Sequence, residues 1–271
     1  MAPLRDQFVS HLNPDQKDLI KAILARCGLY QTPPEQMFFE QVVLHSSSTF
    51  FIQVGANDGD DFVRSILRRY NQKRNIQGVL IEPQPYFFKK LVKNYTGIAH
   101  IEFLNMAISD TEKKATLYYV DYNAMNMPHW AKGLGSFNRE VLMLHGNLIS
   151  DLENSVRSID VPCISMTALL QKMGDNKLDV LITDTEGHDL VILRQINFDL
   201  VKPKLIVFES KHLSKDDLAI CDSMLKPKGY HVFHSDTSDS IAIRPDVMKI
   251  FTSSAKANYV CSELASTHFS S

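Results

Sequence analysis

Two acidic residues and a histidine directly follow a buried-strand pattern in the second half of the chain. Leu178 to Thr183 is mostly apolar, and the sequence from Asp184 to His188 reads DTEGH. Parallel strands of this kind deliver polar side chains to the carboxyl edge of a sheet, where α/β proteins form their sites. Asp184 and Glu186 can therefore move protons, hold polar groups of a ligand or bind a divalent cation.

The next strand pattern ends in the same way. Pro203 to Glu209 is mostly apolar up to its final glutamate, and His212 follows three residues later. We expect Glu209 and His212 to lie beside Asp184 and Glu186, because both strands end at the same edge. His212 and Asp184 are the two candidate bases. A neutral histidine with a pKa of about 6.5 removes a proton readily near neutral pH, whereas an ordinary carboxylate is a weaker base that serves mainly to orient.

These residues also have a plainer, structural interpretation. Asp184 and Glu186 can cap a helix that begins near Asp189, as acidic residues at strand-to-helix turns often do. His188 is either a third member of the site or a solvent-exposed residue of the first helical turn. Clustered acids permit a divalent ion, but oxygen ligands follow no strict spacing, so the sequence assigns no metal ligand.

The element that must position these groups is the stretch from Phe50 to Gly59, which reads FFIQVGANDG. Its aromatic and β-branched run predicts a buried parallel strand, and its glycines predict a tight turn at the end of that strand. Apolar residues at helical spacing from Asp61 to Tyr70 predict a helix whose N-terminal amides face the turn. Strand, glycine turn and helix form the first half of a βαβ unit.

A second strand with an acidic end follows this unit. Gly78 to Ile81 predicts the strand, and Glu82 stands where a nucleotide-binding α/β fold has the carboxylate that accepts hydrogen bonds from ribose hydroxyls. A helix from Tyr86 to Asn94 and a third strand from Ile101 to Leu104 continue the alternation. Three successive strand ends therefore point toward one ligand.

The composition of the glycine turn indicates which ligand this is. Gly55 and Gly59 lack the third glycine of a dinucleotide-binding fingerprint. Asn57 and Asp58 place polar side chains where a pyrophosphate would need bare backbone. These features favour a zwitterionic ligand such as S-adenosylmethionine over a nicotinamide cofactor.

Four segments occur in a characteristic order: VGANDGDD from Val54, VLIEPQPYFFKKL from Val79, FLNMAISDTEKKATLYY from Phe103 and LDVLITDTEGHDLVIL from Leu178. Together they resemble the FkbM-type family of S-adenosylmethionine-dependent methyltransferases, which transfer methyl groups mostly to oxygen. The resemblance covers roughly residues 50–244. It implies a class I methyltransferase fold: a Rossmann-like α/β sheet of seven mostly parallel strands, helices on both faces and an antiparallel final hairpin.

The resemblance also implies roles for individual residues. The implied cofactor contacts are Gly55, Ala56, Asn57 and Gly59 for the methionine part, Glu82 for the ribose, and Ala107, Ile108 and Ser109 for the adenine. Asp184 and Glu186 would lie beside the transferred methyl group. From their positions we expect Asp184 to contact the cofactor as well, and Glu186 and His188 to bind the acceptor. Methyl transfer to an alcohol needs aligned reactants and a group that takes the hydroxyl proton, so we expect Asp184, His212 and Glu209 to be catalytic.

Two positions depart from the family pattern. Members often have a lysine two residues before the aspartate of the DxEG motif, where this chain has Ile182, and an aspartate where Thr167 stands. Both departures concern the acceptor pocket and leave the cofactor motifs intact.

Residues 121–160 interrupt the alternation of strand and helix. They are rich in aromatic residues and methionine and contain a GLGSF turn, so we expect a flexible cover over the substrate. Ser136 matches a serine in a GLGS-like loop of the family, which implies a place near the acceptor, although an ordinary turn serine is the alternative. Tyr122, His129 and Trp130 either stack on a sugar or planar acceptor or simply pack.

The chain divides into three expected parts. Residues 1–48 form an N-terminal helical extension, with helices that start near Pro14 and Pro34. Residues 49–245 form the methyltransferase domain, including the insertion at 121–160. Residues 246–271 form a tail with a short helix and a frayed end.

Composition narrows the class of partner. With 29 basic and 31 acidic side chains, the net charge of −2 gives no general attraction to nucleic acid. No apolar run approaches the roughly twenty residues of a membrane-spanning helix. Four cysteines without CxxC spacing indicate reduced thiols, so we expect a cytoplasmic protein. The sequence assigns no oligomeric state.

Three functions from different classes are consistent with these patterns. The leading hypothesis is methyl transfer from S-adenosylmethionine to a hydroxyl oxygen of a small-molecule or glycan acceptor. The second is a noncatalytic module that keeps the cofactor fold, which Ile182 and Thr167 favour. The third is a metal-dependent hydrolase built on Asp184, Glu186 and Glu209.

Overall fold

The structure is a computed structural model that describes residues 32–252, apart from 111–112, 122, 124–126, 150, 175–177 and 235–238. The expected helix near Pro14, Tyr122 and the part of the expected tail beyond Thr252 lie outside the described residues. Within them, no helix combines the length and the apolar character needed to cross a membrane.

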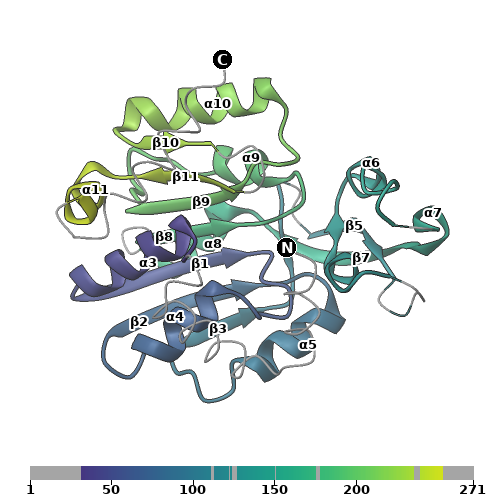
Figure 1. Cartoon of the computed structure of the whole chain (residues 1–271), viewed down its shortest axis with the longest axis horizontal. Coiled ribbons are helices and arrows are strands. Elements are labelled where there is room, and N and C mark those ends of the chain that lie inside the picture. The colour runs from purple at the N-terminus through teal and green to yellow at the C-terminus, as the bar shows by residue number, and fades with distance from the viewer. Residues whose placement is uncertain are drawn as a thin grey trace.

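A seven-stranded sheet forms the centre of the molecule (Figure 1). Across the sheet the strands are β10 (His231–Phe233), β11 (Asp239–Ile243), β9 (Leu205–Glu209), β8 (Val180–Thr183), β1 (Ser48–Val54), β2 (Asn75–Ile81) and β3 (Ile101–Leu104). Neighbours from β9 to β3 pair in parallel, whereas β11 runs antiparallel to both β9 and β10. This order and the reversed β11 confirm the expected class I methyltransferase sheet.

The register of the central strands explains how separate motifs meet. β1 lies between β2 and β8, and Val54 pairs with Ile81 on one side and with Thr183 on the other. The residues that follow these three strand ends are therefore next to one another at the carboxyl edge. Register alone brings the glycine turn, Glu82 and Asp184 to one place.

Seven α-helices and a short 3-10 turn accompany this sheet among the residues that the structure describes. They are α3 (Pro34–His45), α4 (Phe62–Tyr70), α5 (Pro85–Asn94), α8 (Met166–Met173), α9 (Asp189–Arg194), α10 (Lys215–Leu225), η2 (Lys226–Lys228) and α11 (Pro245–Thr252) among the described residues, with two more α-helices in a smaller lobe. Apolar residues of α3, α4, α5 and α11 share one core cluster on one face of the sheet. In α3 the buried residues are Phe38, Phe39, Val42 and Val43, so this helix covers the sheet directly.

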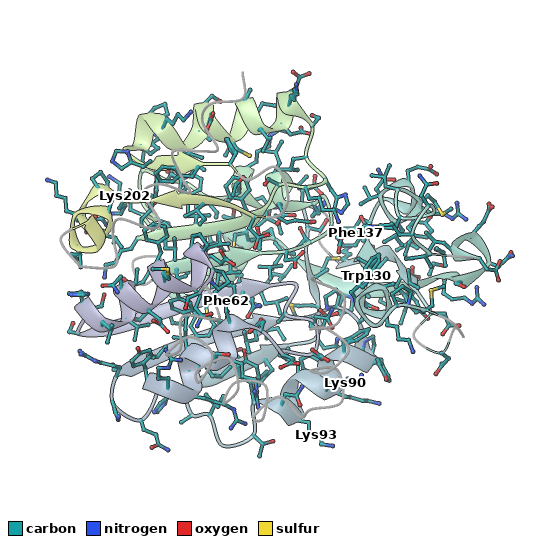
Figure 2. The ribbon with its side chains drawn as sticks, viewed as in Figure 1. Phe62, Lys90, Lys93, Trp130, Phe137 and Lys202 are labelled. Carbon is teal, nitrogen blue, oxygen red and sulfur yellow. The ribbon has the colours of Figure 1, made fainter. Side chains whose placement is uncertain are left out.

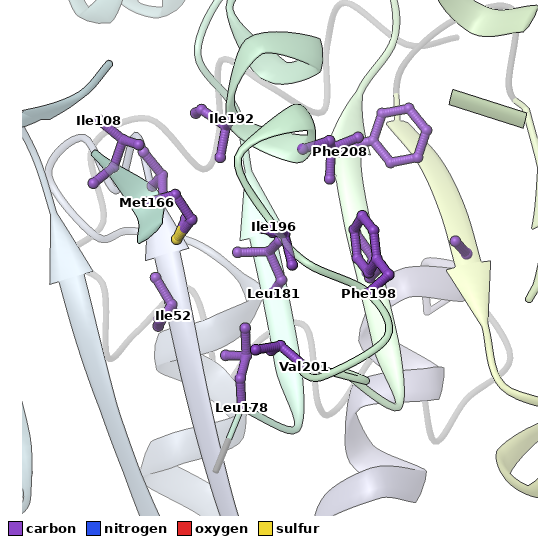
Figure 3. Packing of buried hydrophobic residues seen from close by; sticks show 14 of the residues in the cluster. Ile52, Ile108, Met166, Leu178, Leu181, Ile192, Ile196, Phe198, Val201 and Phe208 are labelled. Carbon is purple, nitrogen blue, oxygen red and sulfur yellow. The ribbon is translucent and has the colours of Figure 1, made fainter. Parts of the chain in front are cut away.

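The opposite face of the sheet is covered by α8, α9 and α10. Met166 of α8 and Ile192 of α9 pack against Ile52, Leu181 and Phe208 of the sheet (Figure 3). Since side chains of a strand alternate between its faces, β1 sends Phe51 into the first cluster and Ile52 into the second. The result is a three-layer arrangement with the sheet in the middle.

A second, four-stranded sheet carries a lobe that projects from the main body (Figure 1). Its order is β4 (Ala107–Ile108), β7 (Val156–Ile164), β5 (Lys113–Val120) and β6 (Gly135–Ser136). The lobe also contains η1 (His129–Gly133), α6 (Arg139–Met143) and α7 (Leu152–Ser155). It has its own core of Val120, Ala131, Leu134, Leu142, Ile149 and Leu152.

The sequence patterns predicted a cover in this region but not its sheet. β5 and β7 pair over their whole length, from Lys113 opposite Cys163 to Val120 opposite Val156, and so reach beyond residues 121–160 on both sides. Most of their side chains are only half-buried or exposed, and Pro162 interrupts the strand pattern of β7. Without a continuous apolar face, neither segment carries a recognisable strand signal.

Candidate active site

The glycine turn after β1 is held close to both neighbouring strands. The backbone N–H groups of Gly55 and Ala56 both donate to the carbonyl oxygen of Ile81, at 2.9 and 3.0 Å. Gly55 has φ +80°, and a Cβ atom there would lie 1.8 Å from the carbonyl oxygen of Asp184. Only glycine therefore fits between β2 and β8 at this point.

The rest of the turn is shaped by Asn57 and Gly59. Asn57 adopts the left-handed conformation with φ +48°, and its backbone N–H donates to Glu82 Oε2 at 2.9 Å. Gly59 has φ +72°, and a Cβ atom there would lie 2.5 Å from the ring of Tyr95 on the adjacent α5 side. The turn is thus fixed by its backbone geometry and by its own side chains, since Asn57 Oδ1 accepts a hydrogen bond from the N–H of Asp58 at 2.7 Å.

Glu82 is a buried carboxylate bound by two backbone amides. Its side chain accepts hydrogen bonds from the N–H of Asn57 and, at 2.8 Å, from the N–H of Gln84. Burial raises the pKa of Glu82 to about 7, although these two hydrogen bonds oppose the rise. The Asn105 amide donates to the carbonyl oxygens of Glu82 and Pro83 and so holds the end of β2.

Two connected hollows lie at this edge of the sheet. The inner cavity, of about 220 Å³, is lined by Gly55, Glu82, Asp184 and Glu186 of the main body and by Ala107, Ile108, Leu117, Trp130, Gly133 and Phe137 of the second sheet and its lobe. The outer cavity, of about 430 Å³, lies on the other side of Gly55 and includes Ala56, Asp58, Gly59, Ile182 and Asp239. Gly55, Asn57, Trp130, Gly133 and Asp184 line both.

The structure brings most of the predicted cofactor residues to these cavities. Ala107 and Ile108 form strand β4 and lie in the wall of the inner cavity. Ser109 is buried, its N–H donates to Ile164 and its hydroxyl contacts Asp110, and it is not among the residues that line either cavity.

The DTEG segment presents two carboxylates in different surroundings. Asp184 lines both cavities. The surrounding protein partly removes water from its carboxyl group, and this desolvation, together with the nearby charge of Glu186, raises the pKa of Asp184 well above the ordinary value. Glu186 has φ +50°, and its carbonyl oxygen accepts a 2.7 Å hydrogen bond from the Ser136 hydroxyl of β6. The side chain of Ser136 thus contacts the backbone of the DTEG turn.

The helix after this turn is not capped by either carboxylate. Its N-cap residue, His188, makes no side-chain cap hydrogen bond. Instead, the buried Asp189 accepts hydrogen bonds from the backbone N–H and the hydroxyl of Thr185, at 3.3 and 2.8 Å. Asp184 and Glu186 line the inner cavity instead of capping the helix. His188 lines the same cavity, and its ring lies 4.9 Å from the ring of Phe137.

Glu209 ends β9 and His212 follows it by three residues, and both lie close to Glu186, as the strand pattern predicted. His212 Nε2 is 2.9 Å from Glu186 Oε2 and 3.4 Å from Glu209 Oε1. Burial, with the charge of Glu186 beside it, raises the pKa of Glu209. Neither Glu209 nor His212 is among the residues that line the two cavities.

His145 is a member of this group that the sequence patterns did not reveal. It follows α6 in the lobe, is 4 % exposed, and its ring lies 5.4 Å from that of His212 and 5.5 Å from that of Trp130. The surrounding sequence, MLHGN, has neither the spacing of a metal motif nor a strand end to mark it. Contacts between the lobe and the main body alone bring it into the site.

Three further contacts close the lobe over the inner cavity. The Gln84 side chain donates to the carbonyl oxygen of Gly133 at 3.0 Å. A Cβ atom on Gly133 would lie 2.0 Å from the Asn57 side chain, so the lobe touches the glycine turn. Trp130 and Phe137 lie where the lobe meets the main body (Figure 2). Trp130 lines both cavities although its side chain is 49 % exposed.

Acidic side chains outnumber basic ones in the cavity walls. Eight carboxylates and two lysines line the two cavities: Glu35, Asp58, Asp60, Asp61, Glu82, Asp184, Glu186, Asp239, Lys90 and Lys132. Such a lining favours a ligand that carries positive charge and disfavours a polyanion.

The two departures from the family pattern fall in different places. Ile182 is buried on β8 and lines the outer cavity. The exposed Thr167 lies on α8, where its hydroxyl donates to the carbonyl oxygen of Gln195 at 2.7 Å, and it lines neither cavity.

Comparison with known proteins gives one strong sequence match. The family model described as "Methyltransferase FkbM domain" matches residues 53–232. No curated protein matches the chain in sequence.

Solved structures with a similar arrangement have low identity to this chain. A putative class I S-adenosylmethionine-dependent methyltransferase from Listeria monocytogenes is 10 % identical, with 86 % of this chain and 68 % of that chain covered and a TM-score of 0.41. An rRNA methylase from Streptococcus thermophilus is 8 % identical, with 78 % and 95 % covered and a TM-score of 0.43. A precorrin-6Y C5,15-methyltransferase from Geobacter metallireducens is 9 % identical, with 78 % and 87 % covered and a TM-score of 0.38.

Proposed function

The chain belongs to the FkbM methyltransferase family, and we propose that it transfers a methyl group from S-adenosylmethionine to a hydroxyl oxygen of a small-molecule or glycan acceptor. The family match supports S-adenosylmethionine-dependent methyl transfer as the reaction class. The choice of oxygen as the methylated atom follows from the resemblance to the family, and the choice of a small acceptor rests on the charge of the cavity walls.

The single observation that carries the proposal is the meeting of Gly55, Glu82 and Asp184 around the inner cavity. S-adenosylmethionine supplies a methyl group already activated on a positively charged sulfur. The acidic lining suits that cation, and the buried Glu82 carboxylate has its orientation fixed by two amides before any ribose arrives. Both features are what a site for this cofactor needs.

We assign the cofactor contacts as follows. Gly55, Ala56, Asn57 and Gly59 form the turn that receives the methionine part, and Glu82 accepts hydrogen bonds from the ribose hydroxyls. Ala107 and Ile108 pack against the adenine. Ser109 supports this wall through its backbone hydrogen bond to Ile164 rather than by contact.

Asp184 is the proposed general base. Its carboxyl group opens onto both cavities, whereas His212 lies behind Glu186. The acceptor hydroxyl gives its proton to Asp184 while its oxygen bonds to the methyl carbon and the bond from that carbon to sulfur breaks. Glu186 and His188 line the acceptor side, and Ser136 fixes the backbone of Glu186. Glu209 and His212 lie next to Glu186, with His212 Nε2 2.9 Å from Glu186 Oε2 and 3.4 Å from Glu209 Oε1.

The proposed acceptor is neutral or cationic and small enough to enter beneath the lobe. Carboxylates outnumber lysines in the cavity walls, which opposes binding of a phosphate-rich polymer. The indole of Trp130, half-exposed at the rim, offers a face on which a sugar ring or a planar acceptor can stack.

Calorimetry and an activity assay test the proposal together. Purified protein should bind S-adenosylmethionine in isothermal titration, and it should pass a labelled methyl group to a component of a cell extract. Asp184→Asn should lower the transfer rate by a factor of about 10² to 10⁴, the contribution of a positioned base. Asp199→Asn, which changes an exposed aspartate far from the cavities in a surface ion pair, is the matched control.

The outcomes separate the alternatives. Folded protein that does not bind S-adenosylmethionine would overturn the proposal. Binding without transfer to any component of the extract would favour a noncatalytic module on the same fold, the function to which Ile182 points.

A further inference from the structure

Four side chains converge where the lobe meets the ends of β8 and β9. The ligand atoms of His145, Glu186 and His212 all lie within 4.8 Å of one another. Glu209 adds a carboxylate oxygen 3.4 Å from His212 Nε2. His145 comes from the lobe and the other three from the main body, so the group spans the boundary between them.

The buried atoms of this group lack hydrogen-bond partners. Among the residues that the structure describes, none pairs with His145 Nε2, His212 Nε2, Glu186 Oε2 or Glu209 Oε2. The His145 residue and the His212 side chain are each only 4 % exposed. An unpaired buried polar group costs roughly 1–3 kcal/mol, so four together call for a ligand that satisfies them at once.

A protonated His212 held between two glutamates does not account for this arrangement. His212 Nε2 and Glu186 Oε2 are 2.9 Å apart, yet they do not form a hydrogen bond, so the ring N–H is not directed at the oxygen. Such an ion pair would also leave His145 Nε2 without a partner. Ligand atoms grouped within 4.8 Å of one another, by contrast, suit a cation.

The donor set indicates the kind of cation. Imidazole nitrogens bind zinc and the neighbouring first-row metals, whereas magnesium and calcium prefer sites made of oxygen alone. Two histidines and one glutamate are also the ligands of a zinc site that keeps a coordination position free. Glu209 lies close enough to orient His212 or to serve as an additional ligand.

We propose that His145, Glu186 and His212, with Glu209 beside them, bind one divalent transition-metal ion of the zinc type. The ion joins the lobe to the main body through His145. Glu186 also lines the inner cavity, so the ion lies at the border of that cavity. On the basis of the proposed function, these residues would hold the ion beside the acceptor side, where it would supply a Lewis acid for the acceptor oxygen.

Cobalt provides a direct spectroscopic probe of this site. Full-length protein, stripped with a chelator, is titrated with Co²⁺, and the visible absorption of the bound ion is followed until Zn²⁺ displaces it. We expect one ion per chain. His145→Ala and His212→Ala should each weaken Co²⁺ binding by at least 10- to 100-fold, whereas His231→Ala, at an exposed position on β10, should bind like the unchanged protein.

The results that would overturn the inference are equally specific. Folded protein without a Co²⁺ spectrum, or His145→Ala with unchanged affinity, rules the site out. Circular dichroism monitors folding, and His145→Gln, which keeps a polar side chain of similar length, serves if the alanine variant does not fold.

Calorimetry with S-adenosylmethionine, on stripped and on Co²⁺-loaded protein, separates this inference from the proposed function. Cofactor binding without Co²⁺ binding overturns the metal site and leaves methyl transfer standing. Co²⁺ binding without cofactor binding overturns the proposed methyl transfer and leaves the metal site standing.

Discussion

At the scale of the residue, Gly55 is constrained twice. Its φ of +80° is unfavourable for any side chain, and the carbonyl oxygen of Asp184 occupies the position of a Cβ atom. The same close approach sets the distance between the glycine turn and the DTEG segment. Because Gly55 has no Cβ atom, the glycine turn and the DTEG segment can approach each other this closely on either side of the inner cavity.

Gly55→Ala should destabilise the protein by about 3 kcal/mol or more, since backbone strain of about 1–3 kcal/mol adds to a steric overlap. Gly97→Ala is the matched control, because Gly97 has φ +85° but no atom within 4 Å of its Cβ position. It should cost the strain alone. Urea denaturation of both variants measures the difference, and equal losses would show that the contact with Asp184 is not limiting.

Glu82 predicts a pH dependence of stability. Its pKa is about 7 in the folded protein, against an ordinary value of 4.5. Between these values the folded state holds a proton that the unfolded chain has released, so this residue makes the free energy of unfolding fall as the pH rises from 4.5 to 7. The slope approaches about 1.4 kcal/mol per pH unit.

Glu82→Gln removes this contribution and so flattens the profile. Comparing the two proteins by urea denaturation at several pH values isolates it from the other buried acids. The variant should also bind S-adenosylmethionine more weakly, since an amide replaces the carboxylate proposed to hold the ribose. A profile that keeps its slope in Glu82→Gln would contradict the assignment of the titration.

At the scale of the element, the helices and strands of the main sheet follow from the sequence, and the smaller sheet does not. β1, β2, β8 and β9 contain short apolar runs that end at, or are followed directly by, glycine or an acidic residue, a pattern typical of buried parallel strands. β5 and β7 carry charged residues and few fully buried ones, so their pairing depends on each other rather than on their own pattern. Local sequence does not encode such mutual support.

The link between β6 and the DTEG turn can be tested at this scale. Ser136→Ala removes the hydroxyl that binds the Glu186 carbonyl and should loosen the lobe over the acceptor side. We expect a loss of about 0.5–1.5 kcal/mol in stability, a raised KM for the acceptor and an almost unchanged affinity for S-adenosylmethionine. Ser223→Ala, which removes an exposed hydroxyl that also donates to a backbone carbonyl, is the control and should leave KM unchanged.

At the scale of the whole molecule, segments from both ends of the described chain complete one face of the sheet. α3 and α11 pack on each other and against the core, and Phe39 is fully buried 5.7 Å from the ring of Phe51. A boundary at residue 48 would separate α3 from the surface that it covers. We therefore propose that α3 folds as part of the methyltransferase domain.

Phe39→Ala tests this proposal, because a truncated ring in a sealed core costs about 3–5 kcal/mol. Leu200→Ala, at a position that is 66 % exposed, is the control and should change the free energy of unfolding by less than about 0.5 kcal/mol. Chemical denaturation gives both values. A small loss for Phe39→Ala would mean that α3 is an appendage.

Some residues of the candidate site are predictable from the local sequence, and others are placed only by contacts between distant parts of the fold. Glu82, Asp184 and Glu209 are predictable because each ends a strand, and the order of strands then places them together. His145 is not, because it depends on how a separate lobe with its own core docks against the main body. Ser109, placed by resemblance in the adenine wall, is instead buried behind it.

The position of the lobe also bears on the order in which the cofactor and the acceptor bind. Trp130, Gly133 and Phe137 roof the inner cavity, and the Gly133 carbonyl is tied to Gln84. If S-adenosylmethionine binds beneath that roof, as proposed, we expect it to enter before the acceptor and its product to leave last. Turnover should then follow a compulsory order, in which S-adenosylhomocysteine inhibits competitively against S-adenosylmethionine and noncompetitively against the acceptor.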